Sequence, residues 1–432
     1  MTNPAANSLS RSSQWGIVVM LMGYAALGHF NRVGISVAGD ELFIPKLGIT
    51  EPRMGWVYTT FLIVYTIGML PGGWLIDRIG SARALTLFGL TMGTFAALTG
   101  TLGWVTNTPE SLWISLLVIR GLAGACNAPL HPGAAHVVSD LMSDQRRATA
   151  NGMVTAGALI GIACCYPVFG WLMDRLNWPL AFVVSGSTLI GFGVLWKYVA
   201  SPSLPAPLQR RAGEVNPPSQ EDVVGPSASR AECSLLLHGN LWLLALSYAA
   251  YGYFQYLFFY WMGYYFKEVL HVPEVDARWA SFWIMLAQGA GMAIGGLSTD
   301  FVCQRLGTTR GRRSIVMTGM GLGALFGLLG VNVTGQINVA MCLAISMASL
   351  GMCEGVFWTT ATDIGGKSRG FSGAFMNTGG NVGGLISPVL TPIIAERLGW
   401  AGAITVACVI AGLGGLVWFV IRPPETLPSP AA

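Results

Sequence analysis

Charged residues are scarce in this sequence. Asp, Glu, Lys and Arg make up 10% of the 432 residues, whereas hydrophobic residues make up 53%. Soluble domains carry about 25% charged residues, because their surfaces face water. A chain with so little charge cannot cover the surface of a soluble α/β domain. The composition therefore predicts an all-α membrane protein whose main partner is the lipid bilayer.

The sequence also lacks a spaced set of metal-ligating or disulfide-forming residues. Its eight cysteines form no spaced framework, and Cys164 and Cys165 are adjacent within one apolar run. His29, His131 and His136 show no ligand spacing either. We therefore expect no structural disulfide, no metal and no cofactor. A membrane-embedded enzyme, which would need a nucleophile or metal constellation, is disfavoured for the same reason.

Long apolar runs dominate what is present, and about 20 apolar residues suffice to cross a bilayer. Twelve such runs are predicted, over residues 14–39, 54–76, 84–104, 111–135, 149–173, 180–199, 239–266, 279–299, 314–333, 337–361, 371–394 and 400–421. Residues 201–234 interrupt them with a segment rich in Pro, Ser, Arg and Glu. We predict a six-helix bundle over 1–200, a cytoplasmic linker over 201–234 and a second six-helix bundle over 235–432.

The distribution of basic residues predicts the orientation. If both termini are cytoplasmic, sixteen Lys and Arg residues fall on the inner side and six on the outer side, and two intramembrane arginines complete the 24. Inner loops of membrane proteins carry such an excess. We predict a multi-pass protein of a bacterial inner membrane with both termini cytoplasmic. We expect a monomer, and no nucleic-acid partner.

The two halves repeat. The segment from Gly72 to Asp77 corresponds to the segment from Gly295 to Asp300, and Trp178 corresponds to Trp400 at nearly the same spacing. Six spans per half bring both copies to the same side of the membrane, so the repeat is parallel. Two parallel six-helix halves around a central site are found in transporters.

The loop after the second apolar run carries Asp77-Arg78-Ile-Gly80-Ser-Ala-Arg83. It resembles the loop motif of the major facilitator superfamily. From their positions at the inner ends of the spans, we predict that Asp77, Arg83 and Asp140 form an inner charge network that latches the outward-open state, and that Gly80 is among the glycines that permit close helix approach. For Arg78, a plain orientation signal is an alternative.

Three further segments are similar to the anion:cation symporter family, which includes sugar-acid, hexuronate, phthalate and sialic-acid carriers. They run over residues 61–73, 120–132 and 358–388, and the similarity extends over nearly all of both halves. The resemblance implies a secondary transporter that moves a small organic anion by alternating access.

Two arginines, Arg32 and Arg120, lie deep inside apolar runs. An Arg at the centre of a span costs about 2.5–3.5 kcal/mol on insertion scales, which suggests a wet cavity that holds something negative. A guanidinium presents a planar fork of donors that matches a carboxylate. The alternative is that each arginine pairs with a buried acid of its own half, yet the deep acid of the sequence, Glu354, lies in the other half.

The resemblance implies that Arg32 contacts the carboxylate of the substrate and that Arg120 takes part in binding or coupling. It also implies cavity positions for Tyr65, Tyr256, Trp358, Thr359 and Asn377. A glutamine of the family aligns with Ala158 here, which favours a smaller or less hydroxylated acid than a hexonate.

The sequence departs from the family at its coupling acids, which Asn31 and Asn127 replace, and we predict that both asparagines belong to the substrate-binding site. Because asparagine cannot titrate, three alternatives remain: a relocated proton site, coupling to another cation, or facilitated diffusion. For relocation the candidates are His131 and Glu354, which hold equivalent positions in the two halves and would titrate together if they face each other. We predict ion-coupled symport, with an organophosphate antiporter as the nearest rival.

Overall fold

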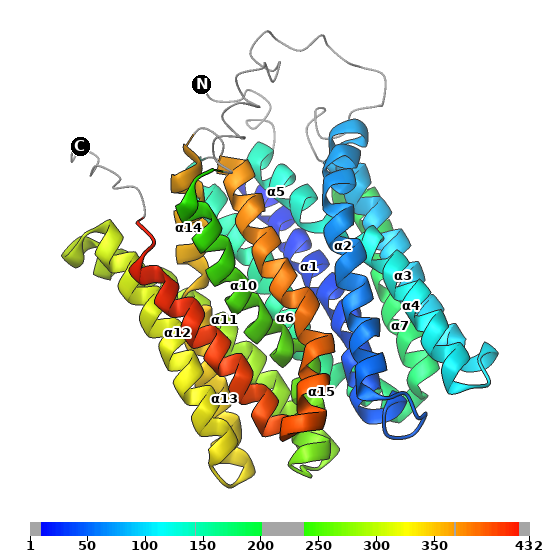
Figure 1. The fold of residues 1–432 in the computed structure, drawn as a ribbon. Coiled ribbons are helices and arrows are strands. Elements are labelled where there is room, and N and C mark those ends of the chain that lie inside the picture. The colour runs from blue at the N-terminus through cyan, green and yellow to red at the C-terminus, as the bar shows by residue number, and fades with distance from the viewer. Residues whose placement is uncertain (1–9, 143, 201–236, 367–368, 423–432) are drawn as a thin grey trace. The chain divides into compact units, whose positions relative to one another are not determined.

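The structure is a computed structural model that describes residues 10–142, 144–200, 237–366 and 369–422. Within these ranges the chain is helical and contains no strand (Figure 1). The predicted linker over 201–234 lies outside the described residues. Contacts divide the chain into two units, Met1–Asn216 with Pro273–Phe282, and Pro217–Val272 with Trp283–Ala432. The predicted all-α class is thereby confirmed for the described residues.

Among the described residues, the first unit is built mainly from seven helices of the chain's first half. They are α1 (Arg11–Ala38), α2 (Glu51–Ile79), α3 (Ser81–Val105), α4 (Pro109–Asn127), α5 (Leu130–Leu141), α6 (Asp144–Leu176) and α7 (Trp178–Leu195), with the π-helical turns η2 (Gly39–Phe43) and η3 (Trp196–Ala200). Helix α1 packs along α6, α3 along α7 and α2 along α4. The side chains of Thr108 and Asn177 cap α4 and α7 and so fix where these helices begin.

The second unit contains the remaining helices. They are α10 (Gly239–Tyr264), α11 (Glu274–Leu306), α12 (Thr308–Asn332), α13 (Gln336–Gly351), α14 (Glu354–Gly365) and α15 (Arg369–Leu416), with the short turns η5 (Tyr265–Val269) and η7 (Val417–Phe419). Helix α10 packs along α15, and α12 contacts both α13 and α15. The beginning of α11, up to Phe282, packs with the first unit.

Eight segments of the described chain are long and apolar enough to cross a membrane. The predicted number was twelve. Helices α1, α2 and α10 are not among the eight, and α15 covers two of the predicted spans. Helix α1 carries His29, Asn31 and Arg32, and α10 carries a run of tyrosines, which lowers their hydropathy. The count of twelve therefore stays a prediction.

The internal repeat is visible in close helix contacts. Gly68 on α2 lies against Ala125 on α4, and a side chain at Gly291 on α11 would meet the carbonyl of Ala348 on α13. Positions 291 and 348 follow 68 and 125 by the spacing that relates the two copies of the repeat. Small residues at these positions let the two backbones approach closely. The same helix pair is thus formed once in each half of the sequence.

Positive backbone φ angles repeat as well. Asn177, which begins α7, has a φ of 72°, and its repeat counterpart Gly399 has a φ of 73° that breaks α15 internally. Gly48 has a φ of 73°, and its counterpart His271 has a φ of 53°. The chain therefore turns in the same way at matching positions of the two halves.

Candidate functional site

Helices α2 and α4 approach closely at Gly124. A Cβ atom at this position would lie 2.3 Å from the carbonyl oxygen of Phe61, so no side chain fits there. Arg120 lies one helical turn before Gly124 and shares its face of α4. The close contact therefore brings the Arg120 side chain onto the ring of Phe61.

The two predicted arginines meet at that ring. The guanidinium carbon of Arg120 lies 4.5 Å from the ring centroid of Phe61, and that of Arg32 on α1 lies 5.4 Å from the same centroid. Arg120 also donates a hydrogen bond of 2.7 Å to the backbone carbonyl of Arg32. Both side chains are buried, at 7% exposure for Arg32 and 2% for Arg120. Three helices thus bring two positive charges to one aromatic ring.

Tyr65 completes this cluster. It follows Phe61 by one turn of α2, and their rings stack with centroids 6.3 Å apart. The guanidinium carbon of Arg32 lies 5.6 Å from the Tyr65 centroid. The structure therefore brings together Arg32, Arg120 and Tyr65, all predicted site residues. Phe61 was missed, because a phenylalanine in an apolar run has the appearance of ordinary packing.

The two asparagines differ in their surroundings. Asn31 donates from Nδ2 to the carbonyl oxygens of Leu27, at 3.0 Å, and Ser185, at 3.3 Å. Asn127 is 1% exposed, and among the described residues neither its Nδ2 nor its Oδ1 has a hydrogen-bond partner. A buried amide without partners costs about 1–3 kcal/mol. Among the described residues, Asn31 thus leaves its Oδ1 without a hydrogen-bond partner, whereas in Asn127 both polar side-chain atoms lack one.

His131 on α5 contacts a second histidine, His29 on α1. Their Nε2 atoms are 3.5 Å apart, and the rings meet edge to face with centroids 5.1 Å apart. His29 also has Nδ1 3.0 Å from the carbonyl oxygen of Ala25. The sequence offers no signal for this contact, because spacing along α1 does not show which residues of α5 it meets.

In the second unit, Glu354 begins α14 within a set of aromatic side chains. Its Oε1 accepts hydrogen bonds from the hydroxyl of Tyr248, at 2.8 Å, and from Nε1 of Trp358, at 2.9 Å. Its Oε2 is buried and, among the described residues, has no hydrogen-bond partner. The predicted facing of His131 and Glu354 concerns residues of different units and stays a prediction.

The other second-unit candidates have contacts of their own. Thr359 donates its hydroxyl to the carbonyl of Gly355 on its own helix, and Trp358 is 40% exposed. Tyr256 packs its ring 6.1 Å from that of Tyr260, and Asn377 is partly buried on α15. Of these residues the structure brings Trp358 to Glu354. Cavity positions for Tyr256, Thr359 and Asn377 stay predictions.

The loop motif is described in part. Gly80 has a φ of 84° and separates α2 from α3, a conformation that suits glycine. Arg78 is exposed beside the Trp74 ring, while the side chain of Asp77 lies outside the described residues. The network of Asp77, Arg83 and Asp140 stays a prediction. In the second unit, Asp363, the repeat counterpart of Asp140, forms an ion pair of 2.6 Å with Arg312.

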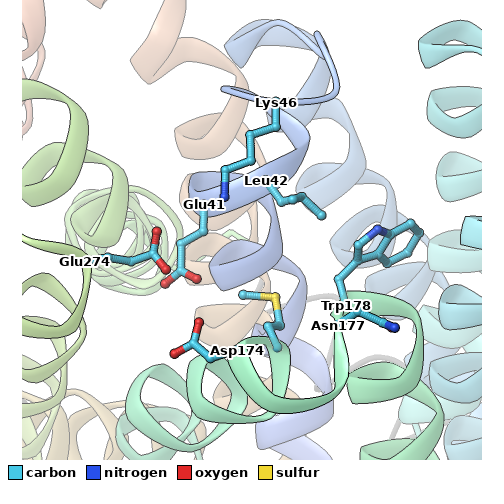
Figure 2. Close-up of a pocket in the computed structure, with 8 residues that line it drawn as sticks. Glu41, Leu42, Lys46, Asp174, Asn177, Trp178 and Glu274 are labelled. Carbon is cyan, nitrogen blue, oxygen red and sulfur yellow. The ribbon is translucent and has the colours of Figure 1, made fainter.

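A second charged cluster surrounds Arg278 in the first unit. Arg278 donates two hydrogen bonds to the carboxylate of Glu41, of 2.7 and 2.8 Å, and further ones to Asp174 and Glu274. Figure 2 shows these three carboxylates beside a cavity of about 230 Å³ that Lys46 also lines. Gly170 leaves the space for the guanidinium, since a Cβ there would clash with it. Glu41 and Asp174 lie far from Arg278 in the chain, so no spacing in the sequence predicts this cluster.

These observations describe a helical membrane protein with paired buried cations in its first unit. A family model of the Major Facilitator Superfamily matches residues 6–365 and 283–432, so the chain belongs to this superfamily of membrane transporters. The predicted superfamily is thereby confirmed.

Curated relatives cover most of the chain. A probable sulfoacetate transporter of Cupriavidus necator is 26% identical over 419 residues, 95% of either chain. A probable galactarate/D-glucarate transporter of Bacillus subtilis is 27% identical and covers 85% of this chain and 83% of its own. A D-galactonate transporter of Escherichia coli is 24% identical over 94% of both chains.

Solved structures agree on the fold. A bacterial homologue of the human lysosomal transporter Spinster, in an inward-facing and unoccupied conformation, matches with a TM-score of 0.77 at 14% identity, over 96% of this chain and 98% of that one. A mutant of the peptide transporter POT matches with a TM-score of 0.72 at 13% identity, over 94% and 93%. At these identities the likeness concerns the fold.

Proposed function

We propose that this protein is a secondary transporter that carries a small organic anion across a bacterial inner membrane by alternating access, coupled to a cation. The observation that supports this most directly is the convergence of Arg32 and Arg120 on the ring of Phe61. Two guanidinium groups at one buried point attract an anionic group and offer it bidentate hydrogen bonds. Arg32 holds the carboxylate, and Arg120 holds or compensates charge.

The substrate class follows from the relatives together with the residues. Sulfoacetate, galactarate, glucarate and galactonate, named for the relatives, are all small acids with at least one carboxylate. Ala158 is buried and offers no hydrogen bond to a hydroxyl group. We therefore favour a compact acid with few hydroxyl groups over a hexonate, and sulfoacetate is the first compound to test.

The experiment is counterflow into liposomes that contain the purified protein. Vesicles are loaded with sulfoacetate, D-galactonate, D-glucarate, glycerol 3-phosphate or neutral D-galactose, and entry of the same radiolabelled compound is measured. We expect counterflow of at least one carboxylate and none of galactose. Faster counterflow of glycerol 3-phosphate than of any carboxylate would favour the organophosphate antiporter instead.

Arginine variants test the site. Arg32→Gln and Arg120→Gln each remove one cation from the Phe61 ring, and we expect counterflow to fall at least tenfold. Arg53→Gln is the matched control, because Arg53 pairs with Glu110 at an exposed position. Full activity in both Arg32→Gln and Arg120→Gln would contradict the proposed site.

A further inference from the structure

We propose that His29 and His131 together form the proton-binding site that couples proton entry to anion transport. This inference rests on the proposed function for its anion and goes beyond it in naming the site. The two imidazoles belong to helices α1 and α5 of the same unit and lie with their Nε2 atoms 3.5 Å apart. Neither Asn31 nor Asn127 can take a proton, so proton coupling needs another titratable group. The pair of His29 and His131, here called the dyad, supplies it.

The hydrogen bonds of His29 determine where its proton lies. A carbonyl oxygen can only accept, so the 3.0 Å contact with Ala25 requires a hydrogen on Nδ1 of His29. The uncharged ring then has its lone pair on Nε2, which faces His131. A hydrogen bond between the rings requires that His131 carries its hydrogen on Nε2, and this leaves Nδ1 of His131 open to a proton.

Proton uptake then has one defined course. A proton binds Nδ1 of His131, a residue that is partly buried whereas His29 is buried. His131 becomes an imidazolium whose Nε2–H donates to the neutral Nε2 of His29. Such charge-assisted hydrogen bonds are shorter and stronger than neutral ones. The present separation of 3.5 Å leaves room for the bond to shorten, so the second imidazole offsets part of the cost of placing a positive charge among buried side chains.

Arg32 links this proton to the anion. It follows His29 by three residues on α1, and its positive charge acts on both rings. An imidazolium beside Arg32 is repelled, whereas an anion held by Arg32 offsets the repulsion. The anion therefore raises the affinity of the dyad for a proton, and by linkage the proton raises the affinity for the anion to the same degree.

The helices around the dyad carry other titratable side chains, and two of them donate hydrogen bonds to the backbone. Tyr24 donates its hydroxyl to Leu85, and Cys165 donates to the carbonyl of Phe30, so both are engaged with the backbone. The remaining titratable or charged side chains on α1, α5 and the elements that pack against them include Tyr65, Arg83, Tyr166, His136, Asp140, Cys164, Asp40, Glu41 and Lys197, and Arg120 bonds to Arg32 from α4. Arg32 is the group whose charge acts on both imidazoles.

Substitutions of the two histidines distinguish proton binding by the imidazoles from their hydrogen bonds to neighbouring groups. His29→Asn keeps an amide donor near the Ala25 carbonyl but has no group that takes a proton. His131→Gln keeps an amide donor near the position of Nε2. The double variant removes titration at both positions. The control is His136→Gln on the same helix as His131, since His136 is exposed. Monodisperse elution and a melting temperature near that of the unmodified protein verify folding of each variant.

The test measures anion affinity against pH in the full-length protein. The probe is the acid of the panel that gives the fastest counterflow, and its dissociation constant is determined between about pH 5.5 and 8. In the unmodified protein and in His136→Gln, we expect the affinity to improve about tenfold for each unit of falling pH on the steep part of the curve, as one linked proton requires. In the double variant we expect a change of less than twofold over the range.

The outcomes distinguish this inference from the proposed function. An unchanged pH dependence in the folded double variant overturns the dyad as the proton site, while counterflow leaves the anion transporter intact. A pH-independent affinity in the unmodified protein overturns the dyad as well. Absence of counterflow for every acid of the panel overturns the proposed function and the coupling together.

Discussion

Asn127 is the residue whose surroundings bear most directly on function. It is buried at the end of α4, two turns after Arg120, and among the described residues both its polar side-chain atoms lack partners. A group that costs free energy in the folded protein is stabilised when a ligand or water occupies its hydrogen-bonding positions. The amide is thus well suited to bind a ligand.

We expect substitutions of the two asparagines, Asn127 and Asn31, to have opposite effects on stability. Asn127→Leu removes a buried amide without partners, so we expect the free energy of unfolding to rise by about 1–3 kcal/mol and the melting temperature to rise with it. We also expect slower counterflow. Asn31→Leu removes the donor to Leu27 and Ser185, so we expect a lower melting temperature. Fluorescence-detected thermal unfolding in detergent measures both. A lower melting temperature for Asn127→Leu would contradict the role inferred for the amide.

Phe61 gives a second prediction at this scale. Phe61→Leu keeps an apolar side chain but removes the π-face that both guanidiniums contact, at about 0.5–2 kcal/mol per cation–π interaction. We expect the dissociation constant of the anion to change by about two- to tenfold because the arginines lose their common support. The control Phe61→Tyr keeps the ring. Equal affinities for both variants would show that the ring does not position the arginines.

The residues of the candidate site differ in how well the sequence predicts them. Arg32 and Arg120 were identifiable because a charge in an apolar run demands compensation. Phe61 and His29 were not, since an aromatic side chain in such a run is compatible with packing alone. Their roles depend on contacts between α1, α2, α4 and α5, which spacing along one helix does not determine.

At the scale of elements, the repeat explains the turns that connect helices. The constant spacing between the two copies was evident from glycines and acids in the sequence, and the structure adds matching helix contacts and matching φ angles. Helix boundaries were harder to predict. Asn177 and Gly399 turn the chain in the same way, yet the sequence marks one with a capping side chain and the other with a glycine.

His271 provides the test of this repeat. It is exposed and has a φ of 53°, and the matching position of the first half is occupied by a glycine, Gly48, with a φ of 73°. A non-glycine residue in this region is strained, so we expect His271→Gly to stabilise the protein by about 1 kcal/mol after the entropic cost of glycine is subtracted.

The control is His238→Gly, because His238 is also exposed but has an ordinary φ of −82°. There glycine relieves no positive φ, and because it is also acceptable at the N-cap of α10, we expect no stabilisation comparable to that of His271→Gly. Thermal unfolding measures both variants. A melting temperature that falls for His271→Gly as much as for His238→Gly would contradict the strain at position 271.

At the scale of the whole molecule, α11 has an unusual place. Its residues up to Phe282 pack with the first unit, while the remainder belongs to the second. The division by composition, at residues 201–234, does not anticipate this, because a hydropathy pattern records no ion pairs between distant segments. Arg278 provides those contacts, with partners on η2, on α6 and on its own helix.

Arg278 therefore holds the beginning of α11 to the first unit, which predicts the effect of removing its charge. Arg278→Gln leaves the carboxylates of Glu41, Asp174 and Glu274 close together without their shared cation, and like charges repel. The Arg278–Glu41 pair is buried, and loss of one partner from a buried ion pair costs about 3–5 kcal/mol. We expect amide hydrogen exchange over residues 273–282 to become at least tenfold faster, whereas exchange in α3 stays unchanged.

Arg175→Gln, beside Asp174 but exposed, is the control and should leave exchange over 273–282 as it is. If exchange in this segment were equally slow in both variants, apolar packing rather than the Arg278 cluster would hold the start of α11.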